Sequence, residues 1–161
     1  MKKVFADAFY FFALANLKDA AHAKAVAFLN TYAGLLVTSV WVLMETADGL
    51  AAPANRDSFL FTLKSLTTNP NVLIVPCDAR LFADGVDLYR RRPDKEWSLT
   101  DCISFVIVQR DGIMEALTGD HHLEQAGFIA LLKQLSRFNH ARCEDGRLPA
   151  RTLLPVCASA Y

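Results

Sequence analysis

Hydrophobic residues in this chain fall into short, nearly unbroken runs that alternate with longer segments of helical spacing. Such short apolar runs predict buried strands. The strands are expected at residues 3–7, 35–39, 72–76, 113–118 and 127–132, the last at an edge. Strands that are apolar along most of their length are typical of a parallel sheet with both faces covered.

The segments between these runs predict the covering helices, because their apolar residues recur with helical spacing. These helices are expected at residues 8–15, 19–32, 40–49, 57–66, 78–92 and 98–110, the first as a short helix or turn. In the fourth helix, Phe59, Leu60, Leu63 and Leu66 are expected to face the core. Regular alternation of strands and helices predicts an α/β fold.

Length and composition fit a single compact domain. The chain has 161 residues, of which 53% are hydrophobic and 21% charged, enough for a sizeable buried core. The longest apolar stretches, around residues 21–36, are interrupted by His22, Lys24 and Asn30, and none reaches the roughly 18 apolar residues of a membrane span. The start of the chain lacks the apolar run of a secretory signal. We therefore expect a cytoplasmic protein without a membrane partner.

The last part of the sequence differs from the rest. After Gln134 the periodic pattern fades, and Pro149 and Pro155 follow. Residues 1–134 are therefore predicted to form the folded domain, and residues 135–161 a C-terminal tail appended to it. The tail is either an arm that binds a partner or appended sequence of artificial or read-through origin.

Cysteine content and charge exclude several classes of function. Cys77, Cys102, Cys143 and Cys157 are widely spaced, which argues against a zinc knuckle or a dithiol redox motif and predicts free buried thiols. Lys plus Arg and Asp plus Glu balance at 17 each, so no global field attracts nucleic acid. Contact with nucleic acid would need a local patch or a bound metal. The arginines at 90–92 are such a patch, or else a solvated helix end.

Two aspartates lie at the junctions of predicted elements. Ser98 precedes Asp101 by three residues at the start of an apolar run, which predicts a helix with a hydroxyl cap and an acid in its first turn. Asp120 follows the predicted strand 113–118 and is expected at its C-terminal tip. Because strand C-termini form the ligand crevice of an open parallel sheet, both carboxylates are expected to face one pocket.

Asp7 and Glu45 are the other two candidates. Asp7 ends the first predicted strand, although an aspartate there is also a common N-cap for the turn that follows. Glu45 follows five apolar residues on the helix that starts at the tip of the second strand. It shares a helix face with Trp41 and Asp48, so an amphipathic edge acid is an equal alternative.

Four carboxylates gathered at one site predict a metal centre. Like charges without basic partners repel, and a hard cation such as Mg²⁺ or Mn²⁺ resolves the repulsion. One or two such ions commonly assist phosphodiester displacement. His121 and His122 adjoin Asp120, but neighbouring histidines at a helix start are expected to point apart, so both are predicted on the surface. Poor binding of soft metals follows, since no cysteine or histidine set is expected to converge.

Other phosphate chemistries lack their residues in this chain. A phosphotransferase of the haloacid-dehalogenase type needs a second aspartate two residues after the first, and here Phe9 follows Asp7 at that spacing. Receiver domains need paired acids and a late lysine, which are missing, and there is no glycine-rich phosphate loop. A serine–histidine–acid set with comparable placement is also lacking.

Five motifs resemble the PIN-domain nucleases, and in particular the VapC-type toxins of bacterial toxin–antitoxin pairs. They are Val-Phe-Ala-Asp at 4–7, Asp-Ala-Ala-His at 19–22, Thr-Ser-Val-Trp-Val-Leu-Met-Glu at 38–45, Ser-Leu-Thr-Asp-Cys-Ile-Ser-Phe at 98–105 and Leu-Thr-Gly-Asp-His-His-Leu-Glu-Gln-Ala-Gly-Phe at 117–128. The last two together are quite specific. The resemblance covers residues 1–134.

The resemblance implies a three-layer α/β/α sandwich with strand order 3-2-1-4-5 and a metal-dependent endoribonuclease acting on single-stranded RNA. It assigns Asp7, Glu45, Asp101 and Asp120 to the acidic, metal-binding quartet with Mg²⁺ or Mn²⁺ as cofactor, and Thr38, Ser39 and Thr100 to the adjacent hydroxyl positions. The expected partners are the RNA substrate, an antitoxin protein and a second copy of the chain in a homodimer. The alternatives are an RNA-processing nuclease without an antitoxin and a non-catalytic PIN-like binding module.

Overall fold

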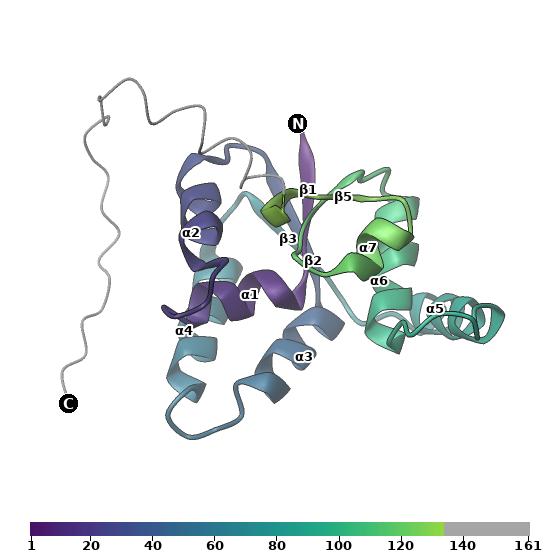
Figure 1. Ribbon diagram of the computed structural model, residues 1–161, viewed down its shortest axis with the longest axis horizontal. Helices are drawn as coiled ribbons and strands as arrows, with labels where there is room; N and C mark the ends of the chain where they lie inside the picture. Colours follow the sequence, from purple (N-terminus) through teal and green to yellow (C-terminus); the bar gives the residue numbers. More distant parts are fainter. Residues whose placement is uncertain (134–161) are drawn as a thin grey trace.

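A five-stranded parallel sheet forms the middle of the computed structural model, which describes residues 1–133 (Figure 1). The proposed tail at residues 135–161 lies outside the described residues. The strands are β1 (Lys3–Ala6), β2 (Leu35–Ser39), β3 (Val72–Val75), β4 (Glu115–Leu117) and β5 (Ile129–Ala130). Their order is β3-β2-β1-β4-β5, with every neighbouring pair parallel. The predicted strand order 3-2-1-4-5 is confirmed.

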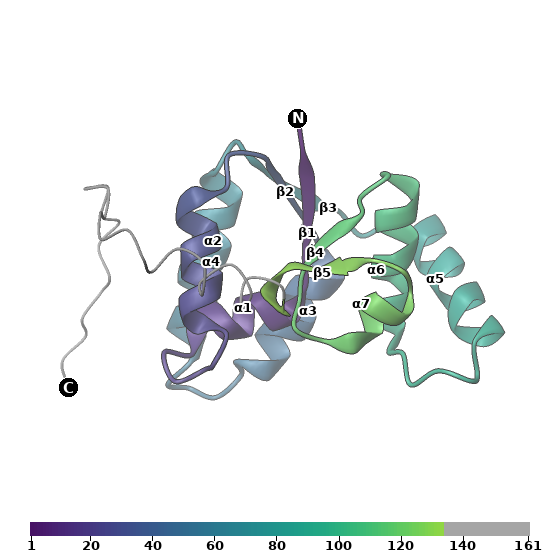
Figure 2. The ribbon, with the colours of Figure 1, turned by 45° about the horizontal axis from the view of Figure 1, so that its top comes forward.

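Seven helices in the described part of the chain cover the sheet. They are α1 (Ala8–Ala15), α2 (His22–Thr31), α3 (Val40–Gly49), α4 (Arg56–Thr68), α5 (Ala79–Arg91), α6 (Leu99–Arg110) and α7 (His121–Gln125). Helices α1, α2 and α4 lie on one side of the sheet, and α5, α6 and α7 on the other, in both ribbon views (Figures 1 and 2). The predicted α/β/α sandwich is confirmed.

Strand β1 lies at the centre because its residues suit burial on both faces. Val4, Phe5 and Ala6 are fully buried. Phe5 pairs in register with Val37 of β2 on one side and with Ala116 of β4 on the other. This central position sets the C-terminal end of β1 between two neighbouring strands, which matters for the residue that follows it, Asp7.

Several element boundaries differ from the sequence prediction. Helix α2 begins at His22 rather than Asp19, because the Asp19 carboxylate accepts the Ala21 N–H at 2.7 Å and holds a turn ahead of the helix. Strand β5 keeps only two residues of the predicted stretch 127–132, and Gly127 there has a positive φ of 93° that breaks an extended strand. The prediction that Leu60 faces the core is wrong, since it is 57% exposed.

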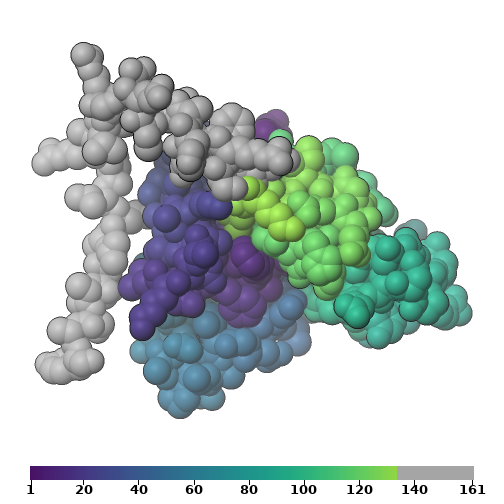
Figure 3. All heavy atoms as spheres, in the orientation of Figure 1, coloured from purple at the N-terminus to yellow at the C-terminus, as the bar shows by residue number. Residues whose placement is uncertain are grey.

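Helices α5 and α6 pack closely through a glycine. A Cβ added at Gly85 would collide with the Ile103 side chain and lie 3.3 Å from the Ile103 Cα. The absence of a side chain thus lets the two helix backbones approach. Helix α5 projects at one end of the molecule, where the space-filling view shows it as the teal lobe (Figure 3).

The arginines at the end of α5 are bonded to nearby acids. Arg90 and Arg91 form ion pairs with Asp87 at 2.7 and 2.8 Å, and Arg92 pairs with Asp94 at 2.9 Å. The arginines thus lie at the C-terminal end of α5, where positive charge is favourable to the helix dipole. This agrees with the interpretation of the run as a solvated helix end. A role in phosphate binding stays a prediction.

Two further sequence predictions can be compared with the described residues. Cys102 is a free buried thiol as expected, but Cys77 is exposed, because it follows β3 in a surface loop; Cys143 and Cys157 lie outside the described residues. Within residues 1–133 no helix is long and apolar enough to cross a membrane.

Candidate metal centre

The candidate site lies where the strand order reverses, between β1 and β4. Asp7 follows β1, and Thr118 and Asp120 follow β4. The Thr118 hydroxyl donates to Asp7 Oδ2 at 3.1 Å and accepts the Asp120 backbone N–H at 3.0 Å. Thr118 is fully buried, and its two hydrogen bonds join the loop after β1 to the loop after β4. This is the crevice in which open α/β sheets commonly hold ligands.

Asp7 is the most strongly perturbed aspartate of the group. The residue keeps some exposed surface, but its carboxyl is largely withdrawn from water. Loss of hydration, followed by repulsion from Asp101 and Asp120, raises the pKa of Asp7 to about 6. Hydrogen bonds from the Ala8 N–H and the Thr118 hydroxyl offset part of this rise. Asp7 also stands at the N-cap position of α1, but its side chain makes no cap hydrogen bond of the usual kind there.

Asp101 enters the site from the first turn of α6. Its backbone N–H donates to the Ser98 hydroxyl at 3.0 Å, and its Oδ2 accepts the Ser98 N–H at 2.7 Å. This reciprocal capping box confirms the predicted helix start. The acid therefore has a structural role, while the same carboxylate is close enough to Asp7 to raise the pKa of Asp7.

Glu45 reaches the group from the middle of α3. The residue as a whole is exposed, yet its carboxyl is partly shielded from water. This shielding, with repulsion from Asp7, Asp101 and Asp120, raises the pKa of Glu45 to about 7. The Glu45 carboxyl therefore lies within electrostatic range of Asp7, Asp101 and Asp120, unlike an edge acid that points away from the sheet.

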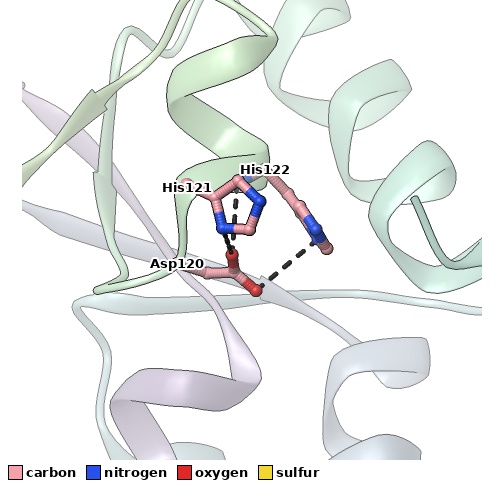
Figure 4. A group of neighbouring side chains, drawn as sticks. All are labelled: Asp120, His121 and His122. Atoms are coloured by element: carbon pink, nitrogen blue, oxygen red, sulfur yellow. Dashed lines mark hydrogen bonds and ion pairs between the residues drawn. The ribbon is translucent and has the colours of Figure 1, made fainter. Parts of the chain in front are cut away.

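The two histidines differ from the prediction. His121 is exposed, with Nδ1 3.0 Å from Asp120 Oδ1. His122 has only 18% of its side chain exposed, and its Nδ1 lies 3.3 Å from Asp101 Oδ2 and 3.5 Å from Asp120 Oδ2. Their rings contact each other, with centroids 4.4 Å apart (Figure 4). The expectation that both point apart on the surface is therefore wrong for His122, and so is the premise that no histidines converge.

The cause is the local backbone at Asp120. This residue is the N-cap of α7 with φ −74° and ψ 146°, and its side chain folds back to accept the His122 N–H at 3.2 Å. The carboxylate consequently lies over the first turn, within reach of both rings. The sequence does carry a signal for this arrangement. An aspartate at an N-cap commonly accepts the N–H of the residue two positions later, which brings Asp120 and His122 together.

A divalent cation fits this set of donors. Among residues 1–133, ion pairs to the four acids come from His121 and His122 alone, and no lysine or arginine forms one with them. Oxygen-rich sites without basic partners suit Mg²⁺ or Mn²⁺. In addition, Asp120, His121 and His122 each offer one ligand atom, and these atoms lie within 4.8 Å of one another.

The hydroxyl residues occupy different places. Ser39 is buried and caps α3 by accepting the Val42 N–H at 3.2 Å, while the buried Thr38 hydroxyl donates to the Ala6 carbonyl at 2.9 Å. Both side chains thus hold the strand ends next to the acids. Thr100 is half-buried in the first turn of α6. Contact of Ser39 or Thr100 with a cofactor or phosphate stays a prediction.

Comparison with known proteins places these features in context. The family model described as "PIN domain" matches residues 4–129. The crystal structure of VapC20 from Mycobacterium tuberculosis, a Sarcin-Ricin loop cleaving toxin, is similar with a TM-score of 0.71 and 25% identity, covering 78% of this chain and 96% of that one. FitAcB from Neisseria gonorrhoeae is similar in fold, with a TM-score of 0.55, 18% identity and coverage of 79% and 94%. No curated protein is significantly similar in sequence.

Proposed function

This chain belongs to the PIN domain family, and on that basis we propose that it is a metal-dependent endoribonuclease that cleaves single-stranded RNA as the toxin of a toxin–antitoxin pair. One observation carries the proposal: carboxylates from four separate elements lie within electrostatic range of one another near the strand tips, where burial first, and then mutual repulsion, raises the pKa values of Asp7 and Glu45. Such an arrangement costs stability in the metal-free protein. A bound cation would offset the repulsion between the carboxylates and remove this cost.

Asp7, Asp101 and Asp120 would hold Mg²⁺ or Mn²⁺, and Glu45 would complete the set or position the attacking water. When bound, the cation supplies positive charge that stabilises a phosphodiester displacement and helps water to lose a proton. Glu45 lies on an exposed part of α3, and its raised pKa suits a group that takes a proton from water near neutral pH. Thr118 keeps the Asp7 carboxylate oriented.

The biological setting rests on similarity to VapC20, which is a Sarcin-Ricin loop cleaving toxin. By analogy, the partners would be an RNA substrate, an antitoxin protein and a second copy of the chain in a homodimer, all in the cytoplasm. A housekeeping RNA-processing nuclease would have the same acids without an antitoxin. A gene for a small DNA-binding protein immediately upstream would favour the toxin, and growth arrest on expression that is relieved by that protein would test it.

The direct test is cleavage of a mixed RNA pool, with a sarcin-ricin hairpin included, by chelator-treated protein with and without added Mn²⁺. We expect cleavage only with metal. Glu45→Gln should lower the rate by about two orders of magnitude or more, in the range that acid–base groups contribute. Asp48→Asn is the matched control, because Asp48 is an exposed acid three residues further along the same helix. Full cleavage without metal, or by Glu45→Gln, would contradict the proposal, and so would binding of RNA without any cleavage, as expected of a non-catalytic module.

A further inference from the structure

An imidazole lies between two of the acids. His122 Nδ1 is 3.3 Å from Asp101 Oδ2 and 3.5 Å from Asp120 Oδ2, and these oxygens belong to different elements. The side chain is 18% exposed, far less than the 60% of His121 beside it. The backbone of His122 is held next to the same acid, since its N–H donates to Asp120 Oδ1 at 3.2 Å. The acidic quartet implied by the family resemblance does not include this residue.

The two spacings can be compared with those of atoms that share one ion. Two ligand atoms, each about 2.1 Å from a metal, lie about 3.0 Å apart at a right angle and about 3.4 Å apart at a tetrahedral angle. A hydrogen bond between an imidazolium and a carboxylate is instead about 2.7 to 2.9 Å long. The observed 3.3 and 3.5 Å exceed that length and leave room for a common metal neighbour.

We propose that His122 is a ligand of the divalent cation held by Asp101 and Asp120, and that its nitrogen makes the site prefer Mn²⁺ and Co²⁺ over Mg²⁺. The inference rests on the proposed metal-dependent function and names the metal class that this particular site takes. Mg²⁺ favours oxygen donors, whereas imidazole suits the transition metals, whose affinity for such ligands rises from Mn²⁺ to Co²⁺. Replacing one oxygen donor by nitrogen therefore raises the affinity for Mn²⁺ and Co²⁺ more than for Mg²⁺.

A purely structural role makes a different prediction. If His122 only offsets the charge of Asp101 and Asp120, it competes with the cation. Its removal would then leave the ratio of Mn²⁺ to Mg²⁺ affinity unchanged, and would raise the affinity for both metals. Selectivity between metals, rather than affinity for one metal, thus separates the two roles.

The experiment uses the full chain, stripped of metal, and three variants. Calorimetric titration with Mn²⁺, Co²⁺ and Mg²⁺ in turn should show that His122→Ala loses at least about tenfold in affinity for Mn²⁺ and Co²⁺, the scale of a ligand-shell change, and much less for Mg²⁺. His122→Asn places an amide oxygen near the Nδ1 position and should keep Mg²⁺ binding while losing the preference for Mn²⁺ and Co²⁺. His121→Ala tests the neighbouring imidazole separately, because its Nδ1 lies 3.0 Å from Asp120 Oδ1; if His122 supplies the nitrogen, this variant keeps the preference for Mn²⁺ and Co²⁺.

Pulsed electron paramagnetic resonance of bound Mn²⁺ gives a direct reading of the ligand. We expect a nitrogen coupling in the wild type and in His121→Ala that disappears in His122→Asn and His122→Ala. A wild-type signal without nitrogen coupling would overturn the inference even if the variants fail to fold. An unchanged metal preference in His122→Ala would also overturn it.

The same samples separate this inference from the proposed function. RNA cleavage without nitrogen coupling would support the proposed nuclease activity and contradict the assignment of His122 as a metal ligand. Nitrogen coupling in samples that bind Mn²⁺ but cleave no RNA would support His122 as a metal ligand and contradict the proposed nuclease activity. Absence of metal binding altogether would contradict both.

Discussion

Replacing Asp7 by asparagine should stabilise the metal-free protein at neutral pH. The pKa of the Asp7 carboxyl rises from 3.8 to about 6 on folding, chiefly because burial removes its hydration. A raised carboxyl pKa means that ionisation opposes folding, so the penalty grows as the pH rises from about 4 to about 6 and is fully present above that. Below the ordinary pKa of 3.8 the penalty is absent.

The size of the effect follows from the two pKa values. A difference of about 2 corresponds to roughly 3 kcal/mol. The neutral amide of Asp7→Asn avoids this cost, but one carboxylate oxygen is replaced by an NH₂ donor, and one lost hydrogen bond costs about 1 kcal/mol. The variant should therefore be about 2 kcal/mol more stable than the wild type at pH 7.5, and about 0.5 kcal/mol less stable near pH 4.

Urea denaturation in the presence of a chelator measures both differences. Asp48→Asn is the control, since this exposed acid should change the free energy of unfolding by less than about 0.5 kcal/mol at either pH. Adding Mn²⁺ should then stabilise the wild type and much less the Asp7→Asn variant, because binding to the native state adds to its stability. A variant that is less stable than the wild type by the same amount at both pH values would refute the reasoning.

Three other changes test separate parts of the structure. Gly85→Ala should destabilise the protein by about 1 to 3 kcal/mol, because its Cβ collides with Ile103 across the α5–α6 contact; urea denaturation against the exposed Asp84→Ala checks it. Thr118→Val should cost about 1 to 3 kcal/mol and weaken Mn²⁺ binding in calorimetry, because the Asp7 carboxylate and the Asp120 N–H both lose their buried partner. A chain ending at Gln134 should melt within a few degrees of the full chain, because the buried core extends from Val4 to Leu132; a large drop would refute the domain boundary.

The order of elements could be predicted because the local signals agree with the fold. Ser98 and Asp101 marked a helix start that the capping box reproduces, and the apolar runs became strands in the expected sequence. The predicted edge strand 127–132 is longer than β5, because an apolar run does not show where pairing with the next strand stops. Gly127 turns the chain with positive φ, and Ile129–Ala130 alone pair with β4 in the described part of the chain. The prediction for Leu60 is wrong because helical spacing identifies the apolar face of α4 but not how much of that face the rest of the protein covers.

The acids of the site were easier to predict than their neighbours. A carboxylate at a strand tip is visible from the chain alone, whereas the partner of that carboxylate depends on packing between distant segments. The role of Thr118 cannot be predicted from the sequence, because its bond to Asp7 exists only after β1 and β4 pair. The position of His122 is equally hidden, since the direction of its ring depends on how the Asp120 side chain folds over the first turn of α7.

The hydrogen bond between Asp7 and Thr118 spans 111 positions of the sequence, and this separation has a consequence for biosynthesis. At about 5 to 20 residues per second, Asp7 is made on the order of 10 s before its partner. A nascent chain arrested before β4 should accordingly show no Mn²⁺-dependent stabilisation, which limited proteolysis of such chains would detect. The proposed metal site would thereby be completed only when translation of the domain is nearly finished.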